Sequence, residues 1–221
     1  MRLRNAIICA TATLAIGGAA EAGAARSGST CHGQPATYVG TNGDDRIAVG
    51  ESDLGDDPVL VLRGGDDRVI LSGEVATGSV TICGDGGSDY LVALEDTRAD
   101  AFLIDGGSGA DRVGDNSNVD NSGVGPMRLF GAAGDDDLIG TDSADRLVGG
   151  AGEDLLLAVD GDDKLVAGPG DDSLFGHGGD DRSFGGDGED RIESGGGEDF
   201  ADGGADDDTC KGVEEAVSCE G

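Results

Sequence analysis

The chain has 221 residues, and its 14 Lys plus Arg against 46 Asp plus Glu give a formal net charge of −32. Gly contributes 44 residues, aromatic residues make up 3%, and Pro occurs only 4 times. So acidic a surface repels phosphate, which argues against nucleic-acid binding, and a collagen-like helix would need far more Pro. Disorder is disfavoured because the acids are 35 Asp to 11 Glu and the aliphatic residues recur at regular intervals.

The N-terminal segment has the pattern of a secretory signal peptide. Arg2 and Arg4 precede an apolar stretch over residues 6–16, and small residues with Ala-x-Ala cleavage options follow at 20–24. We expect residues 1–24 to be removed on export and the protein to be extracellular. The apolar stretch is too short to span a bilayer, and no second one follows, so no membrane span is predicted.

After an N-terminal cap over residues 25–39, residues 40–130 carry one nine-residue motif at wide spacing. GTNGDDRIA begins at residue 40, and related motifs begin at 62, 84 and 106, at a constant period of 22. The next motif begins at 131, after an interval of 25. Each interval also contains a second apolar run, at 59–61, 80–82, 102–104 and 127–130. The spacing predicts coils with two sides, one of them wider than the other.

Residues 131–211 are nine consecutive blocks of nine residues with no insertion or loss. We number the positions of a block from one to nine. Position six is Asp in all nine blocks, position eight is aliphatic in most, and position four is Gly in seven. Ser183 and Ala201 depart at position eight and weaken the core, and Asp206 departs at position four. Residues 212–221 form a C-terminal cap.

The period has one economical geometric interpretation. Each block is a tight turn plus a short strand, two blocks make one coil, and coils stack about 4.8 Å apart. The sequence therefore predicts an all-β, parallel β-solenoid without a long helix. The predicted inward-facing column on one side consists of Ile47, Val69, Leu91, Val113, Leu138, Leu156, Leu174, Ile192 and Cys210.

Stacking places the position-six carboxylates in two rows, and such rows need counterions. Two unit charges about 5 Å apart repel by about 3 kcal/mol at an effective dielectric of 20. Carboxylate and carbonyl oxygens are hard ligands, and a flexible all-oxygen cage suits Ca²⁺ better than Mg²⁺. We therefore predict Ca²⁺ as the cofactor. The candidate ligands are Asp45, Asp67, Asp89, Asp111, Asp136, Asp154, Asp172, Asp190 and Asp208 in one row and Asp145, Asp163, Asp181 and Asp199 in the other.

The repeat resembles the hemolysin-type calcium-binding repeat, the RTX repeat, whose pattern is G-G-x-G-x-D-x-(aliphatic)-x. GGAGEDLLL at 149 and GGDGEDRIE at 185 match every defined position, and the resemblance covers roughly residues 40–211. It implies a right-handed β-roll that binds Ca²⁺ between coils and folds on metal binding. The flanking segments are similar to those of small secreted bacterial members.

Four cysteines follow the signal segment, which favours two disulfides in an exported chain. We expect Cys210 to pair with Cys219 and Cys31 with Cys83; the alternative is free cysteines or links between chains. No enzyme motif is present, so we expect no catalysis. The sequence predicts a secreted, monomeric, calcium-binding structural protein. The alternative is a calcium-dependent adhesin that binds a cell-surface partner through Phe175, Phe184 and Phe200 or through the insert at 115–126.

Overall fold

A computed structural model describes residues 29–49, 54, 56–73, 76, 78–94, 97–115 and 124–219. The predicted signal peptide, residues 1–24, and most of the insert at 115–126 lie outside the described residues. Everything described is strand, turn or irregular structure, as the sequence predicts.

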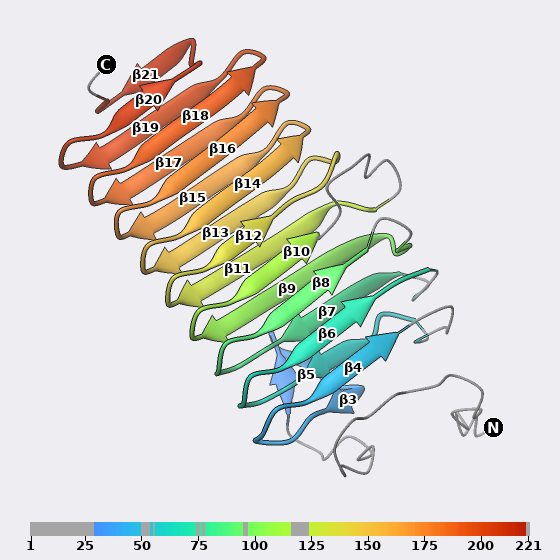
Figure 1. Cartoon of the computed structure of the whole chain (residues 1–221). Coiled ribbons are helices and arrows are strands. Elements are labelled where there is room, and N and C mark those ends of the chain that lie inside the picture. The colour runs from blue at the N-terminus through green and yellow to red at the C-terminus, as the bar shows by residue number, and fades with distance from the viewer. Residues whose placement is uncertain are drawn as a thin grey trace.

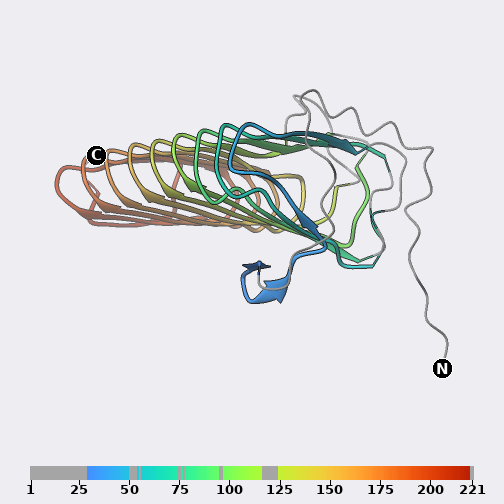
Figure 2. The ribbon, with the colours of Figure 1, turned by 90° about the horizontal axis from the view of Figure 1, so that it is seen from below.

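Two parallel sheets form the two long walls of a flattened coil (Figures 1 and 2). The chain alternates between them, so each coil contributes one strand to each sheet. The 9-stranded sheet contains β4 (Arg46–Val49), β6 (Arg68–Leu71), β8 (Tyr90–Ala93), β10 (Arg112–Asp115), β12 (Asp137–Ile139), β14 (Leu155–Asp160), β16 (Ser173–Gly178), β18 (Arg191–Gly196) and β20 (Thr209–Lys211). The 10-stranded sheet contains β3 (Tyr38–Val39), β5 (Val59–Val61), β7 (Ser79–Cys83), β9 (Ala101–Ser108), β11 (Met127–Ala133), β13 (Arg146–Ala151), β15 (Lys164–Pro169), β17 (Arg182–Asp187), β19 (Phe200–Ala205) and β21 (Glu215–Val217).

The strand register confirms the predicted coil lengths. Ile47 pairs with Val69 in the wide coils, at the predicted period of 22. Leu138 pairs with Leu156 in the narrow coils, at the predicted period of 18. The predicted inward column is continuous from Ile47 to Cys210 through β4, β6, β8, β10, β12, β14, β16, β18 and β20. The fold is therefore the predicted parallel β-solenoid.

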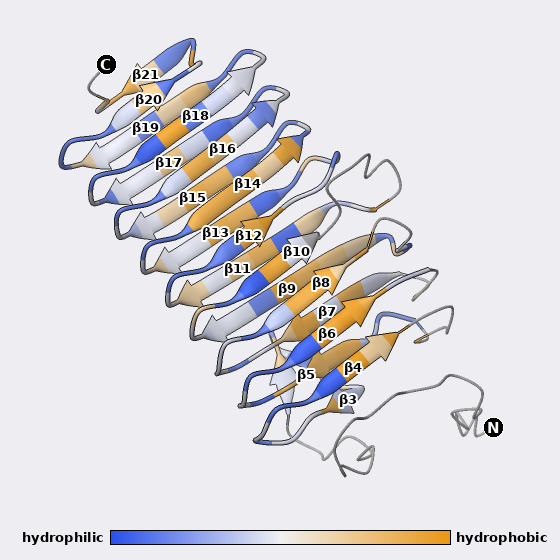
Figure 3. Cartoon of the chain, in the orientation of Figure 1, coloured by the Kyte–Doolittle hydropathy of each residue, from blue (hydrophilic) through white to orange (hydrophobic). Residues whose placement is uncertain are grey.

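The core is one thin apolar layer between the sheets. Leu138, Leu147 and Leu156 are fully buried in it. Ser183 and Ala201 continue the second inward column after Leu165, and both are also fully buried. Figure 3 shows the apolar colour of the middle strands giving way to paler colour in β19. The loss of aliphatic burial predicted for the C-terminal coils is therefore present.

Both expected disulfides are present, one near each end of the stack. Cys31, in the small hairpin of β1 (Thr30–Cys31) and β2 (Gln34–Pro35), is bonded to Cys83 of β7. Cys210 of β20 is bonded to Cys219, nine residues along the chain. No helix in the described part of the chain is long and apolar enough to cross a membrane.

Candidate metal centre

The position-six aspartates are buried, although they lie at turns. All thirteen predicted ligands are between 1% and 6% exposed. Each directly precedes or lies close to a strand whose inward residue anchors the turn, as Asp154 precedes β14 and buried Leu156. Burying so many carboxylates requires partners, because an isolated buried charge costs several kcal/mol or more.

In eleven of the thirteen carboxylates, one oxygen accepts a hydrogen bond from the aspartate of the neighbouring coil. The backbone N–H of Asp136 donates to Oδ1 of Asp154 at 2.9 Å, and that of Asp154 donates to Oδ1 of Asp172 at 2.7 Å. The pattern repeats along both rows, with distances of 2.6 to 2.9 Å. Each of these eleven aspartates therefore reaches back to the preceding coil and accepts a hydrogen bond from the aspartate there, whereas Oδ1 of Asp145 accepts the N–H of Met127 at 2.6 Å.

The second oxygen, Oδ2, is buried without a hydrogen-bond partner in most of these aspartates. A buried acceptor left unpaired costs about 1–3 kcal/mol, and more when it is charged. Because the same unpaired oxygen recurs in successive coils, it indicates a binding site for a further partner. The aspartates with an unpartnered Oδ2 among the described residues are Asp67, Asp89, Asp111, Asp136, Asp154, Asp163, Asp172, Asp181, Asp190, Asp199 and Asp208.

These oxygens share their surroundings with a main-chain carbonyl of the next coil. A β-carbon on Gly131 would collide with Oδ2 of Asp136 and would lie 2.7 Å from the carbonyl oxygen of Gly149. The same relation holds at Gly176, where the neighbours are Oδ2 of Asp181 and the carbonyl of Ser194. At these two positions, glycine leaves room for carboxylate and carbonyl oxygens from successive coils to converge. Carboxylate and carbonyl oxygens are the hard donors that Ca²⁺ prefers.

Burial raises the pKa of these carboxyls, and neighbouring carboxylates add to the effect. The pKa of Asp163 is raised to about 8, mainly by desolvation and then by the charges of Asp145 and Asp181. The pKa values of Asp89 and Asp136 are raised to about 7 for the same reasons. The N–H donor from the preceding coil opposes the rise without cancelling it. Without a cation, the rows therefore retain protons at a pH where free aspartate is ionised.

Asp45 and Asp145 differ from the other eleven aspartates. Thr41 and Thr141, at position two of their blocks, donate backbone N–H bonds of 2.6 and 2.5 Å to Oδ2 of Asp45 and Asp145. The threonine hydroxyls contact the same carboxylates. Asp45 begins the first row, and Asp145 begins the second. Each row therefore starts at a turn whose carboxylate is already satisfied by the protein.

The acids at position five behave differently from those at position six. Oδ1 of Asp135 accepts the N–H of Glu153 at 2.9 Å, and Oδ1 of Asp162 accepts that of Asp180 at 3.0 Å. These acids are exposed and reach forward to the following coil, whereas the position-six acids reach back. They support the turn from the solvent side, the role that their exposure favours over metal ligation.

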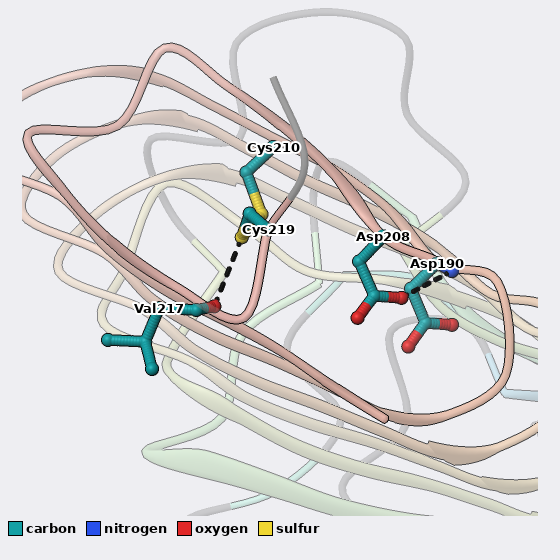
Figure 4. Close-up of a disulfide and its surroundings, with 5 residues drawn as sticks. All are labelled: Asp190, Asp208, Cys210, Val217 and Cys219. Carbon is teal, nitrogen blue, oxygen red and sulfur yellow. Dashed lines mark hydrogen bonds between the residues drawn. A yellow bond between two sulfur atoms is a disulfide. The ribbon is translucent and has the colours of Figure 1, made fainter. Parts of the chain in front are cut away.

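Asp206, which replaces glycine at position four of the last block, keeps the positive φ of this turn. Asp206 has φ 80°, in the left-handed region occupied by Gly152 (φ 141°) at the same position. Asp tolerates this region better than most non-Gly residues. Asp208 beyond it keeps its hydrogen bond with Asp190 (Figure 4).

Comparison with known proteins agrees with this geometry. Residues 130–163, 157–192 and 184–212 match the family model of the RTX calcium-binding nonapeptide repeat. The repeats of residues 130–212 therefore belong to the RTX calcium-binding repeat family, and Ca²⁺ is their cofactor. No curated protein matches the chain.

Proposed function

We propose that the protein is an exported, non-catalytic module whose coils fold around Ca²⁺ ions bound between successive turns. The observation that carries the proposal is the set of eleven buried Oδ2 atoms without a partner. Ca²⁺ at each would neutralise the rows and satisfy these oxygens. Extracellular calcium sites bind at about 10⁻⁴–10⁻³ M, and sites that share one folding transition titrate together.

The ligands that we propose are these eleven aspartates with the position-one carbonyls of the following coil. Asp45 and Asp145 close the rows at their N-terminal ends through Thr41 and Thr141. The regular recurrence of the carboxylates supports a structural lattice rather than one active site. Export through residues 1–24 and a monomeric state without nucleic-acid partners belong to the same proposal.

Far-UV circular dichroism during a Ca²⁺ titration of calcium-free protein tests the proposal, with Mg²⁺ as the control. We expect β signal to rise sharply with Ca²⁺, to fall again on chelation, and to stay low with Mg²⁺. A β spectrum already complete without calcium would refute metal-driven folding.

A second candidate function is calcium-dependent binding to a cell-surface partner. A groove of about 840 Å³ near the C-terminal end is lined by Lys164, Phe184, Phe200 and several acids. The two phenylalanine rings lie 5.7 Å apart, and the Lys164 ammonium lies 5.2 Å from the Phe184 ring. The Phe184→Ser/Phe200→Ser variant should keep its calcium binding and lose retention on cell-envelope material. If the variant and the wild-type protein were retained equally, this surface would be ruled out as the binding site.

A further inference from the structure

The C-terminal tail has the register of a shortened repeat block. Ile192 of β18 pairs with Cys210 of β20, at the period of 18 found in the preceding coils. Ala201 of β19, however, pairs with Ala216 of β21, at a separation of only 15. The tail therefore makes one more pass along the 10-stranded sheet after a turn three residues shorter than the others.

Glu214 occupies the place that a position-six aspartate would take in this shortened block. The backbone N–H of Asp199 donates to Oε2 of Glu214 at 2.8 Å. In the coil before, the N–H of Asp181 donates to Oδ1 of Asp199 at 2.9 Å. Glutamate is one methylene longer than aspartate, so its carboxylate can cover the distance that the shortened turn leaves.

Asp199 itself has a carboxylate oxygen without a partner among the described residues. Asp199 is 2% exposed, and its Oδ2 is buried without a hydrogen bond. Asp199 and Glu214 both line the 840 Å³ groove, which gives the space between them access to solvent. The N–H donor and the unpaired buried oxygen of Asp199 repeat those of the earlier pairs in the row, whereas the Glu214 carboxylate is exposed where the aspartates are buried.

The tail imitates a repeat at a second point, in the other row. A β-carbon on Gly203 would collide with both Oδ2 of Asp208 and the carbonyl oxygen of Ser218. This is the relation of Gly131 to Asp136 and to the carbonyl of Gly149. Cys219 directly follows Ser218, and its disulfide with Cys210 holds this part of the tail against the last coil (Figure 4).

We propose that residues 212–219 complete one further calcium site in each row. The Glu214 carboxylate joins Asp199 in one site, and the Ser218 carbonyl joins Asp208 in the other. The proposal rests on calcium binding by the rows, because the tail only supplies the ligands that a tenth repeat would have supplied. The tail then supplies calcium ligands in addition to closing the stack through its disulfide.

Counting bound Ca²⁺ by equilibrium dialysis, at a concentration that saturates wild type, tests the Glu214 site. The variant is Glu214→Gln, whose amide oxygen can still accept the Asp199 N–H, so this hydrogen bond between the coils is preserved. The matched control is Glu215→Gln, which removes the same charge from the adjacent exposed residue. Because ligand charge sets affinity, we expect Glu214→Gln to lose one ion or bind it at least about tenfold more weakly. The control should bind as wild type does.

Equal counts and affinities for both variants would overturn the Glu214 site, while a wild-type protein that binds no Ca²⁺ would instead refute the proposed function. The Ser218 site is tested with Cys210→Ala/Cys219→Ala, which frees the carbonyl without changing a carboxylate. We expect one ion to bind at least about tenfold more weakly. Circular dichroism confirms that the coils remain folded. Unchanged affinity at every site in the folded variant would overturn this part of the proposal.

Discussion

Asp172 donates its backbone N–H to Oδ1 of Asp190 at 2.9 Å, while Oδ2 of Asp190 has no partner. One carboxylate thus has two unequal oxygens, one used by the protein and one available to the proposed Ca²⁺. A variant that keeps the first oxygen and removes the charge can separate the two roles.

Asp172→Asn should reduce calcium binding with little direct damage to the coil. The Asn side-chain oxygen can still accept the N–H of Asp154, which now reaches Asp172 at 2.7 Å. The lost charge should remove one bound ion and raise the Ca²⁺ midpoint of folding. Dialysis and circular dichroism measure these two quantities.

Asp171→Asn is the control for this change, because Asp171 is the exposed neighbour at position five. Its Oδ1 accepts the N–H of Glu189 at 2.9 Å, and Asn can do the same. We expect the calcium count and midpoint of wild type. Equal losses in the two variants would show that total charge, and not the buried row, controls binding.

Calcium-free protein should be more folded in mild acid than in mild alkali. The pKa of Asp163 is raised to about 8, and those of Asp172 and Asp181 to about 6, by burial and neighbouring charges. Because the folded state binds these protons more tightly, the stabilisation is complete below the ordinary aspartate pKa and is lost as pH rises through about 6 to 8.

Circular dichroism of resin-stripped protein, recorded at steps of about one pH unit between about pH 4 and pH 9, measures this dependence. With saturating Ca²⁺ the trend should reverse, since protons then compete with the ion for the same oxygens. Stability that rises with pH in the calcium-free protein would contradict the assignment.

Thr141→Val should destabilise the fold without removing a calcium ion. The Thr141 hydroxyl lies 3.1 Å from Oδ2 of Asp145, and the residue is fully buried. The hydroxyl also accepts the Ser143 N–H at 3.1 Å, so its loss should lower the free energy of unfolding by about 1–3 kcal/mol. Urea unfolding in saturating Ca²⁺ measures the change, and a lost ion would show that the Asp145 turn is itself a metal site.

Ser183→Ala should stabilise the C-terminal coils. Ser183 is fully buried between Leu165 and Ala201, and its hydroxyl has no hydrogen-bond partner among the described residues. Removing an unsatisfied buried hydroxyl should raise the free energy of unfolding by up to about 1 kcal/mol. The control is Ser173→Ala at the start of β16, where the side chain is only partly buried. It should leave the free energy of unfolding unchanged. A destabilised Ser183→Ala protein would mean that the hydroxyl has a partner in solution.

The regular part of the molecule could be predicted because one period determines both the register and the burial. Position eight faces inward and position six meets its equivalent in the next coil, so the column from Ile47 to Cys210 followed directly. The even cysteine count predicts two disulfides but does not determine their connectivity. The expected pairs Cys31–Cys83 and Cys210–Cys219 are both present.

The ends of the rows were harder to predict because they break the period. Thr at position two of GTNGDDRIA and GTDSADRLV was the signal for the two closed turns, at Asp45 and Asp145. Glu214 lies three residues out of register, so the period of the narrow coils does not find it. The signal available was an acid directly before a strand, Glu215–Val217, in a tail bounded by cysteines.

The two rows of aspartates start at different coils, so the N-terminal and C-terminal parts of the molecule are stabilised by different interactions. The second row begins at Asp145, so the wide coils depend on one row, a continuous aliphatic core and the Cys31–Cys83 link. The C-terminal narrow coils depend on two rows, and Ser183 and Ala201 bury less apolar surface there than the leucines of the earlier coils. A fall in calcium should therefore loosen the chain from its C-terminal end, and the N-terminal coils should remain as a template on which the rest can reassemble.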